Sequence, residues 1–168
     1  MIEIKIIGRG GMGAVTASQI LAKAAFYDRK YSQAFPNFGI ERSGAPVFAF
    51  VRIDDKPIIL REQVYKPDYV IVLDSSLLNV VEIENPKKEM LVNSSKKINK
   101  VKTVDITKLA LETFGRPIVN TAIIGSFAKL TKLVSLNSVY KAIEDIFKEN
   151  GELIKKNKEV VKKAYERS

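Results

Sequence analysis

A glycine-rich segment near the N-terminus constrains the fold of this 168-residue chain more than any other feature. The segment is Gly-Arg-Gly-Gly-Met-Gly at residues 8–13, directly after the apolar run 4–7 and before an alanine-rich stretch that extends to about residue 27. A strand, a G-x-G-x-x-G turn and a helix in this order are typical of the first unit of an α/β fold. Glycines let the backbone approach an anion closely, and a helix N-terminus offers free N–H groups and a partial positive charge. The candidate binding residues are Gly8, Arg9, Gly10, Gly11, Met12 and Gly13.

The acidic residue that would complete a dinucleotide-binding fingerprint is missing. Such folds place an Asp or Glu about 20 residues beyond the glycines, at the end of the second strand. The next extended stretch, residues 31–35, contains no acid, and Asp28 precedes it beside Arg29 and Lys30, where a turn or a helix C-terminus suits it better. NAD binding is therefore disfavoured. Two interpretations remain: a tight turn without a ligand, or a loop that receives a phosphate or a polar substrate tail.

The rest of the chain predicts alternating strands and helices. The predicted strands are 47–53, with a turn at 54–57 and a returning strand at 58–60, then 69–73, 90–93 and 103–105. The predicted helices are 107–114, 121–130, one capped by Asn137 or Ser138, and a last one after Gly151. We expect a single domain over residues 1–168. Its fold class is α/β, with three layers, a mostly parallel sheet, helices on both faces and an antiparallel hairpin excursion.

Composition excludes several classes of function. The chain contains no Cys and no His. It therefore has no disulfide, no thiolate zinc site and no Cys-ligated iron–sulfur cluster of its own, and it lacks the commonest general base and metal ligand. No apolar run approaches the roughly 20 residues that span a bilayer. Because the chain begins directly with a strand, we expect no signal peptide, no membrane partner and a cytoplasmic location.

The net charge of +9 comes entirely from the second half, where residues 85–168 hold 18 basic and 9 acidic side chains. Such asymmetry can indicate nucleic-acid binding. The basic residues are mostly Lys mixed with Glu, without the interleaved aromatics that base stacking requires. A solvated Lys-rich face is the favoured interpretation, and we expect no nucleic-acid partner. Lys and Glu enrichment without Cys or His is compatible with a thermophilic source.

Residues 35–46 form a second unusual segment, Phe-Pro-Asn-Phe-Gly-Ile-Glu-Arg-Ser-Gly-Ala-Pro. Two aromatics, two prolines and two glycines make it stiff and apolar for a loop, and such a loop packs against something. One interpretation is packing on its own domain; the other is a subunit interface or the mouth of a shared active site. The candidate residues are Phe35, Pro36, Phe38, Gly39, Glu41 and Arg42.

Several motifs occur together along the whole chain. They are the segment 8–13 with Val15-Thr16-Ala17, Gln33-Ala34-Phe35-Pro36, Phe38-Gly39, Glu41-Arg42, Gly44-Ala45-Pro46-Val47, Val51-Arg52-Ile53-Asp54-Asp55, and Asn120-Thr121 with Gly125. In this combination the sequence resembles the gamma subunit of 2-oxoacid:ferredoxin oxidoreductases, in the pyruvate or shared pyruvate/ketoisovalerate branch. It departs from that family at Met12, where Gln is usual, and at Ser43, where Arg is usual.

The resemblance implies a division of labour. The complex decarboxylates a 2-oxoacid oxidatively, transfers the acyl group to coenzyme A and passes electrons to ferredoxin, or runs in reverse. Its alpha, beta and delta subunits would hold thiamine diphosphate, magnesium and iron–sulfur clusters, and this chain alone would bind none of them and contribute no catalytic residue. This chain would bind coenzyme A through residues 8–13, Asn120 and Thr121. A free-standing nucleotide- or phosphate-binding regulatory domain remains the alternative.

Overall fold

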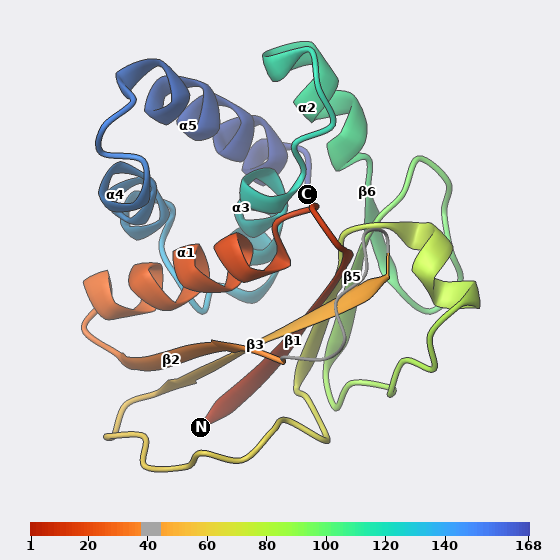
Figure 1. The fold of residues 1–168 in the computed structure, drawn as a ribbon, viewed down its shortest axis with the longest axis vertical. Helices are drawn as coiled ribbons and strands as arrows, with labels where there is room; N and C mark the ends of the chain where they lie inside the picture. The colour runs from red at the N-terminus through yellow and green to blue at the C-terminus, as the bar shows by residue number, and fades with distance from the viewer. Residues whose placement is uncertain (38–44) are drawn as a thin grey trace.

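The computed structural model describes residues 1–37 and 45–168, and they form one six-stranded sheet covered by helices (Figure 1). The strand order is β2-β3-β1-β4-β5-β6. The strands are β1 (Ile2–Arg9), β2 (Tyr31–Pro36), β3 (Pro46–Asp54), β4 (Tyr69–Val72), β5 (Glu89–Asn93) and β6 (Lys102–Val104). The helices are α1 (Ala14–Tyr27), the 3-10 helix η1 (Ser75–Asn79), α2 (Ile106–Phe114), α3 (Asn120–Thr131), α4 (Leu136–Ile146) and α5 (Gly151–Glu166).

The sheet is mixed. Strands β1, β4, β5 and β6 run parallel to one another, whereas β3 is antiparallel to both β1 and β2. The α/β class and the mostly parallel sheet with an antiparallel excursion are thus confirmed. The predicted partner of β3 was wrong, because residues 58–60 form no strand. Both edges of β3 are already occupied by β1 and β2, so the chain after β3 crosses a sheet face instead of extending the ladder.

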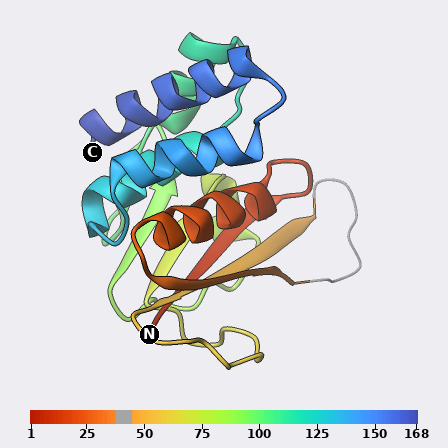
Figure 2. The same ribbon diagram turned by 90° about the vertical axis from the view of Figure 1, so that its left-hand side faces the viewer.

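The two faces of the sheet are covered differently. Ile4, Ile6 and Ile71 belong to the large core shared with the five α-helices, and Figure 2 shows the red α1, light blue α4 and dark blue α5 on the same side of the sheet. Ile7 and Val72 belong to a smaller core on the other face, with Leu77 of η1 and irregular segments packed against it. The third layer therefore consists of a short 3-10 helix and irregular chain, where the sequence predicted helices.

Local signals located most helix ends correctly. Helix α1 ends at Asp28, as its position after the alanine-rich stretch indicated. Helix α4 is capped by the side chain of Ser135, which accepts from the N–H of Ser138, so the predicted cap at Asn137 or Ser138 was displaced toward the N-terminus. Asn150 caps α5 in the same way. None of the helices in the described part of the chain is long and apolar enough to cross a membrane.

Candidate functional site

The glycine loop, residues 8–13, is a closed turn between β1 and α1. The N–H of Met12 donates to the carbonyl of Arg9, and the N–H of Gly10 donates to the carbonyl of Ala45, both at 2.9 Å. Gly11 has φ +89° and Gly13 has φ +79°, which are left-handed backbone conformations that residues other than Gly rarely adopt. Gly13 occupies the N-cap position of α1, where no side chain of residues 1–37 or 45–168 accepts from the first N–H groups of the helix. These N–H groups point out of the N-terminal end of α1, which is the end of a helix that favours an anion.

A second helix begins at the same place. A Cβ added to Gly13 would lie 2.3 Å from Nδ2 of Asn120, so the first residue of α3 is packed directly against the glycine loop. Helix α3 also begins without a side-chain cap. The structure thus brings together the two segments that the sequence singled out, 8–13 and 120–121, although more than 100 residues separate them.

Two buried polar atoms at this junction lack partners. Oδ1 of Asn120 and Oγ1 of Thr121 are inaccessible to solvent and make no hydrogen bond within the described residues. The Thr121 side chain as a whole is 1% exposed. A buried polar atom without a partner costs about 1–3 kcal/mol. Such atoms are uncommon in a folded protein and call for an explanation, of which a missing ligand is one.

Arg9 connects the glycine loop to the neighbouring strand β4. Its Nε donates to Oδ2 of Asp74 at 2.8 Å, and its Nη2 donates to Oγ of Ser76 at 2.7 Å. Partial burial acts to raise the pKa of Asp74, but hydrogen bonds from Ser76 and Arg9 outweigh it and hold that pKa below its ordinary value. Asp74 therefore stays ionised and orients Arg9. Asp74 was not among the site residues predicted from the sequence, although an acid directly after a buried parallel strand is a usable signal.

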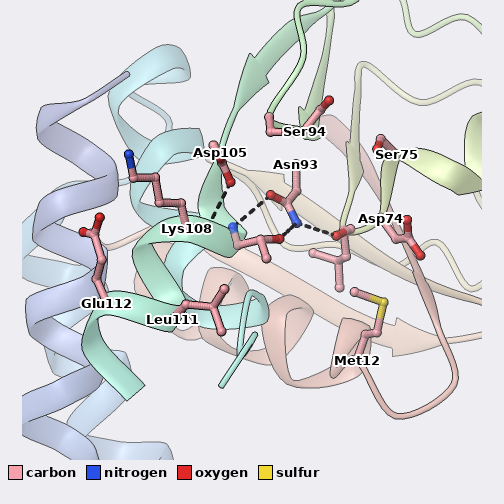
Figure 3. A pocket seen from close by; sticks show the side chains of 12 residues that line it. Met12, Asp74, Ser75, Asn93, Ser94, Asp105, Lys108, Leu111 and Glu112 are labelled. Carbon is pink, nitrogen blue, oxygen red and sulfur yellow. Dashed lines mark hydrogen bonds between the residues drawn. The ribbon is translucent and has the colours of Figure 1, made fainter. Parts of the chain in front are cut away.

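A cleft of about 610 Å³ adjoins the glycine loop at the carboxyl ends of β4, β5 and β6; we call it the carboxyl-edge cleft (Figure 3). Its volume lies in the usual range of small-molecule sites. Figure 3 shows Lys108 and Leu111 of α2 on one side and Met12 of the glycine loop on the other. The lining residues are Met12, Leu73, Asp74, Ser75, Asn93, Ser94, Ser95, Asp105, Thr107, Lys108, Leu111 and Glu112.

Asn93 holds the floor of this cleft in place. Its Nδ2 donates to the carbonyl of Leu73 and to Oγ1 of Thr107, both at 2.9 Å. Its Oδ1 accepts from the N–H groups of Ile106 and Thr107, and Asp105 accepts from the N–H of Lys108. The first N–H groups of α2 are therefore already satisfied. An anion would meet open helix N-termini at α1 and α3, not at α2.

The second candidate segment is only partly described. Phe35 and Pro36 end β2, and the Phe35 ring lies 5.4 Å from the ring of Phe50 on β3, so Phe35 packs on its own sheet while remaining partly exposed. Its backbone neighbour Asn37 donates to the carbonyl of Phe48 at 2.9 Å. Phe38, Gly39, Glu41 and Arg42 lie outside the described residues.

A glycine turn at the end of the first strand, beside a cleft at the carboxyl edge of a mixed sheet, is an arrangement that recurs in α/β proteins with nucleotide-like ligands. Residues 3–167 match the family described as pyruvate ferredoxin/flavodoxin oxidoreductase. The chain therefore belongs to this family, and within it to the gamma-type subunits. It is thus one subunit of a multi-subunit oxidoreductase.

Three relatives specify this placement. The pyruvate synthase subunit PorC of Methanothermobacter thermautotrophicus is 56% identical over 154 residues, 88% of this chain and 86% of the relative. The common subunit gamma of pyruvate/ketoisovalerate oxidoreductases of Thermococcus kodakarensis is 53% identical over 161 residues, 88% of this chain and 87% of the relative. The crystal structure of the pyruvate oxidoreductase subunit PORC of Thermotoga maritima superimposes with a TM-score of 0.83 at 38% identity, covering 99% of this chain and 96% of that one.

Proposed function

We propose that this chain is the gamma subunit of a pyruvate (2-oxoacid):ferredoxin oxidoreductase and supplies part of its coenzyme A site. The complex would convert pyruvate and coenzyme A into acetyl-CoA and carbon dioxide and pass the released electrons to ferredoxin. The relatives at over 50% identity are subunits of pyruvate synthase and of pyruvate/ketoisovalerate oxidoreductases, which supports pyruvate as the substrate of the complex. The alpha, beta and delta subunits would carry thiamine diphosphate, magnesium and the iron–sulfur clusters. A chain without Cys offers no thiolate for a cluster.

The meeting of α1 and α3 at Gly13 carries this proposal. Both helices begin there without a side-chain cap, so two partial positive charges converge on one point. The unpartnered Oδ1 of Asn120 and Oγ1 of Thr121 add polar groups at the same junction. The pyrophosphate of coenzyme A is an anion of suitable chemistry for such a junction.

The edge strand β2 disfavours NAD at the same loop. A dinucleotide site needs a carboxylate at the end of the second strand to hold the ribose hydroxyls. Tyr31–Pro36 contains no acid, and Asp28 is turned to α4, where it accepts hydrogen bonds from Ser135 and Ser138. Coenzyme A does not require that carboxylate. Because the named relatives are subunits, a free-standing regulatory domain is not favoured.

Residues 35–46 are proposed as the contact with a partner subunit or with the mouth of the shared active site. The segment leaves the sheet after Pro36 and returns to it at Pro46, and the carbonyl of Ala45 accepts from the glycine loop. A partner bound to this segment would therefore lie next to the proposed coenzyme A site. This placement supports a site completed between subunits.

The coenzyme A proposal is tested by Gly11→Val in the assembled complex. The Cβ of residue 11 would meet nothing within 4 Å, so the substitution acts on the loop backbone at φ +89° and on the space in front of it. We expect the KM for coenzyme A to rise about tenfold, a loss of about 1.4 kcal/mol, with the KM for pyruvate unchanged.

Gly115→Val is the matched control, because Gly115 has φ +67° and equally open surroundings at the far end of α2. It should cost similar backbone strain without changing either KM. Equal increases of the two KM values in Gly11→Val, with normal assembly, would mean that the glycine loop is only structural.

A further inference from the structure

We infer that the carboxyl-edge cleft receives the phosphorylated adenosine end of coenzyme A, with Lys108 facing the ribose phosphate. This inference rests on the proposed function and extends it to a second region of the chain. The cleft is built by β4, β5, β6 and α2, none of which was selected as a binding element from the sequence.

The first argument is position. Met12 belongs to both the glycine loop and the cleft, and Asp74 joins them through its ion pair with Arg9. The chain leaves β1 toward β2 on one side and returns to β4 on the other, so the loop and the cleft lie where the strand order reverses. Open α/β sheets bind ligands at this crevice. In coenzyme A the adenosine is joined directly to the pyrophosphate, so a pyrophosphate at the loop places the adenosine beside it.

The second argument is the chemistry of the lining. Met12, Leu73 and Leu111 provide apolar surface for a base, and Leu111 is 48% exposed although it is a large apolar residue. Hydroxyl groups that can bond a ribose come from Ser75, Ser94, Ser95 and Thr107. Apolar walls with a few polar groups are the usual composition of a small-molecule site.

The third argument is charge. Each of the three carboxylates in the lining already has a partner. Asp74 forms an ion pair with Arg9, and Asp105 accepts from the backbone N–H of Lys108. Oε2 of Glu112 lies 3.7 Å from Nη2 of Arg167. The ammonium of Lys108 makes no ion pair with any described residue. The exposed residues Lys96 and Lys97 follow directly after the lining residue Ser95. Arg9, Arg167 and Lys108 balance the three carboxylates, so Lys96 and Lys97 leave the rim of the cleft with a net positive charge. That charge favours the phosphate-bearing end of coenzyme A over the uncharged pantetheine arm.

The experiment compares coenzyme A with dephospho-coenzyme A, which lacks the ribose phosphate, as acyl acceptors of the assembled complex. Lys108→Met keeps the aliphatic stem and removes the charge. We expect it to raise the KM for coenzyme A about fivefold and to leave the KM for dephospho-coenzyme A unchanged. Lys102→Met is the matched control, because Lys102 is an exposed lysine on neighbouring β6 that does not line the cleft. It should change neither value.

A second variant tests occupancy of the cleft itself. Leu111→Glu places a negatively charged, helix-forming side chain on a half-exposed position of the lining, and it should raise the KM for both acceptors, with the KM for pyruvate unchanged. Val80→Glu, at another exposed apolar position away from the cleft, serves as its control.

The outcomes separate the two levels of the proposal. If Leu111→Glu changes neither KM while Gly11→Val raises that for coenzyme A, the cleft inference is wrong and the proposed function stands. If Lys108→Met raises both values equally, the cleft holds a part of the ligand other than the ribose phosphate, and the assignment of the adenosine end is overturned. If none of the three variants changes a KM for coenzyme A, the proposed function fails as well.

Discussion

Arg52 is fully buried near the C-terminal end of β3, and all three nitrogens of its guanidinium donate hydrogen bonds. Its Nε donates to Oε1 of Glu3 at 2.9 Å, and its Nη1 and Nη2 donate to the carbonyls of Leu60 and Glu62. The ring of Phe35 lies 5.1 Å from its Cζ. A buried charge is tolerated when it is paired and hydrogen-bonded in this way. Arg52 therefore fastens the irregular chain after β3 across the face of the sheet.

Replacing Arg52 by Met should destabilise the protein by about 3 kcal/mol, because the carboxylate of Glu3 and two carbonyls lose their donor. Urea unfolding of the purified subunit measures the change in the free energy of unfolding. Lys102→Met is the control, since Lys102 is exposed and its Nζ lies 3.9 Å from Oε1 of Glu89. This substitution should change the free energy of unfolding by less than about 0.5 kcal/mol. Similar effects of the two substitutions would show that Arg52 contributes no more than a surface ion pair.

At the scale of elements, one carboxylate joins the end of α1 to the start of α4. Asp28 accepts from the N–H of Ser135 at 2.6 Å, from its Oγ at 2.8 Å and from Oγ of Ser138 at 2.6 Å. Partial burial acts to raise the pKa of Asp28, but the hydrogen bonds from Ser138 and Ser135 outweigh it and hold the pKa below its ordinary value. The ionised form therefore stabilises the folded state.

Asp28→Ala should accordingly destabilise the protein by about 1–2 kcal/mol at pH 7, because the N–H of Ser135 and two hydroxyl groups lose an ionised acceptor. Because the pKa of Asp28 is lower in the folded than in the unfolded state, its contribution is present above the unfolded value of about 3.9 and is lost as the pH falls through the folded value. Thermal melts of the wild type and the variant should therefore converge only as the pH falls below the ordinary pKa of an Asp and through the lower folded value. Asp55→Ala, at an exposed position, should show neither effect. A difference independent of pH would contradict this account.

Packing between α3 and α5 also explains why residue 125 is a glycine. A Cβ at Gly125 of α3 would lie 2.3 Å from the carbonyl oxygen of Val161 on α5. Oγ of Ser126 donates to the carbonyl of Ala164 at 3.2 Å across the same contact. The helices therefore approach more closely than side chains would allow. This contact holds α3, and so its N-terminus at the glycine loop, in a rigid setting.

At the scale of the whole molecule, residues 35–46 are expected to direct assembly. Phe38→Ala should reduce co-purification of the other subunits while the isolated subunit keeps its melting temperature, because an aromatic side chain buried at an interface contributes about 1.5–3 kcal/mol. The experiment is a pull-down of the partner subunits combined with a thermal melt of the isolated subunit. Tyr65→Ala, at a strongly exposed aromatic elsewhere, is the control.

Arg42→Ala separates the two forms of this proposal. Activity should fall more than assembly if the guanidinium faces a ligand, and assembly more than activity if it pairs across an interface. A large drop in melting temperature of either variant, with assembly unchanged, would mean that the segment packs on its own domain.

The local parts of this protein followed from local sequence. The glycine spacing predicted the β1–α1 turn, the acid after an alanine-rich helix predicted the end of α1, and short apolar runs predicted β4 and β5. That Asn120 and the glycine loop belong to one site was expected from the family resemblance and not from the residues themselves. The partner of β3 was predicted wrongly because the turn at residues 54–57 suggested a hairpin with residues 58–60. The antiparallel partner is instead β2, the strand that precedes β3 in the chain.

The sequence by itself determined the glycine turn between β1 and α1, most of the order of strands and helices, and the absence of thiolate and imidazole chemistry, because these depend on residues close together in the chain. Only the tertiary structure decided that β3 lies between β1 and β2, that Arg52 is buried, and that Arg9 meets Asp74. It also decided that α2 closes a cleft beside the glycine loop. Contacts between distant residues depend on which faces pack together, and periodicity along the chain carries no information on that choice.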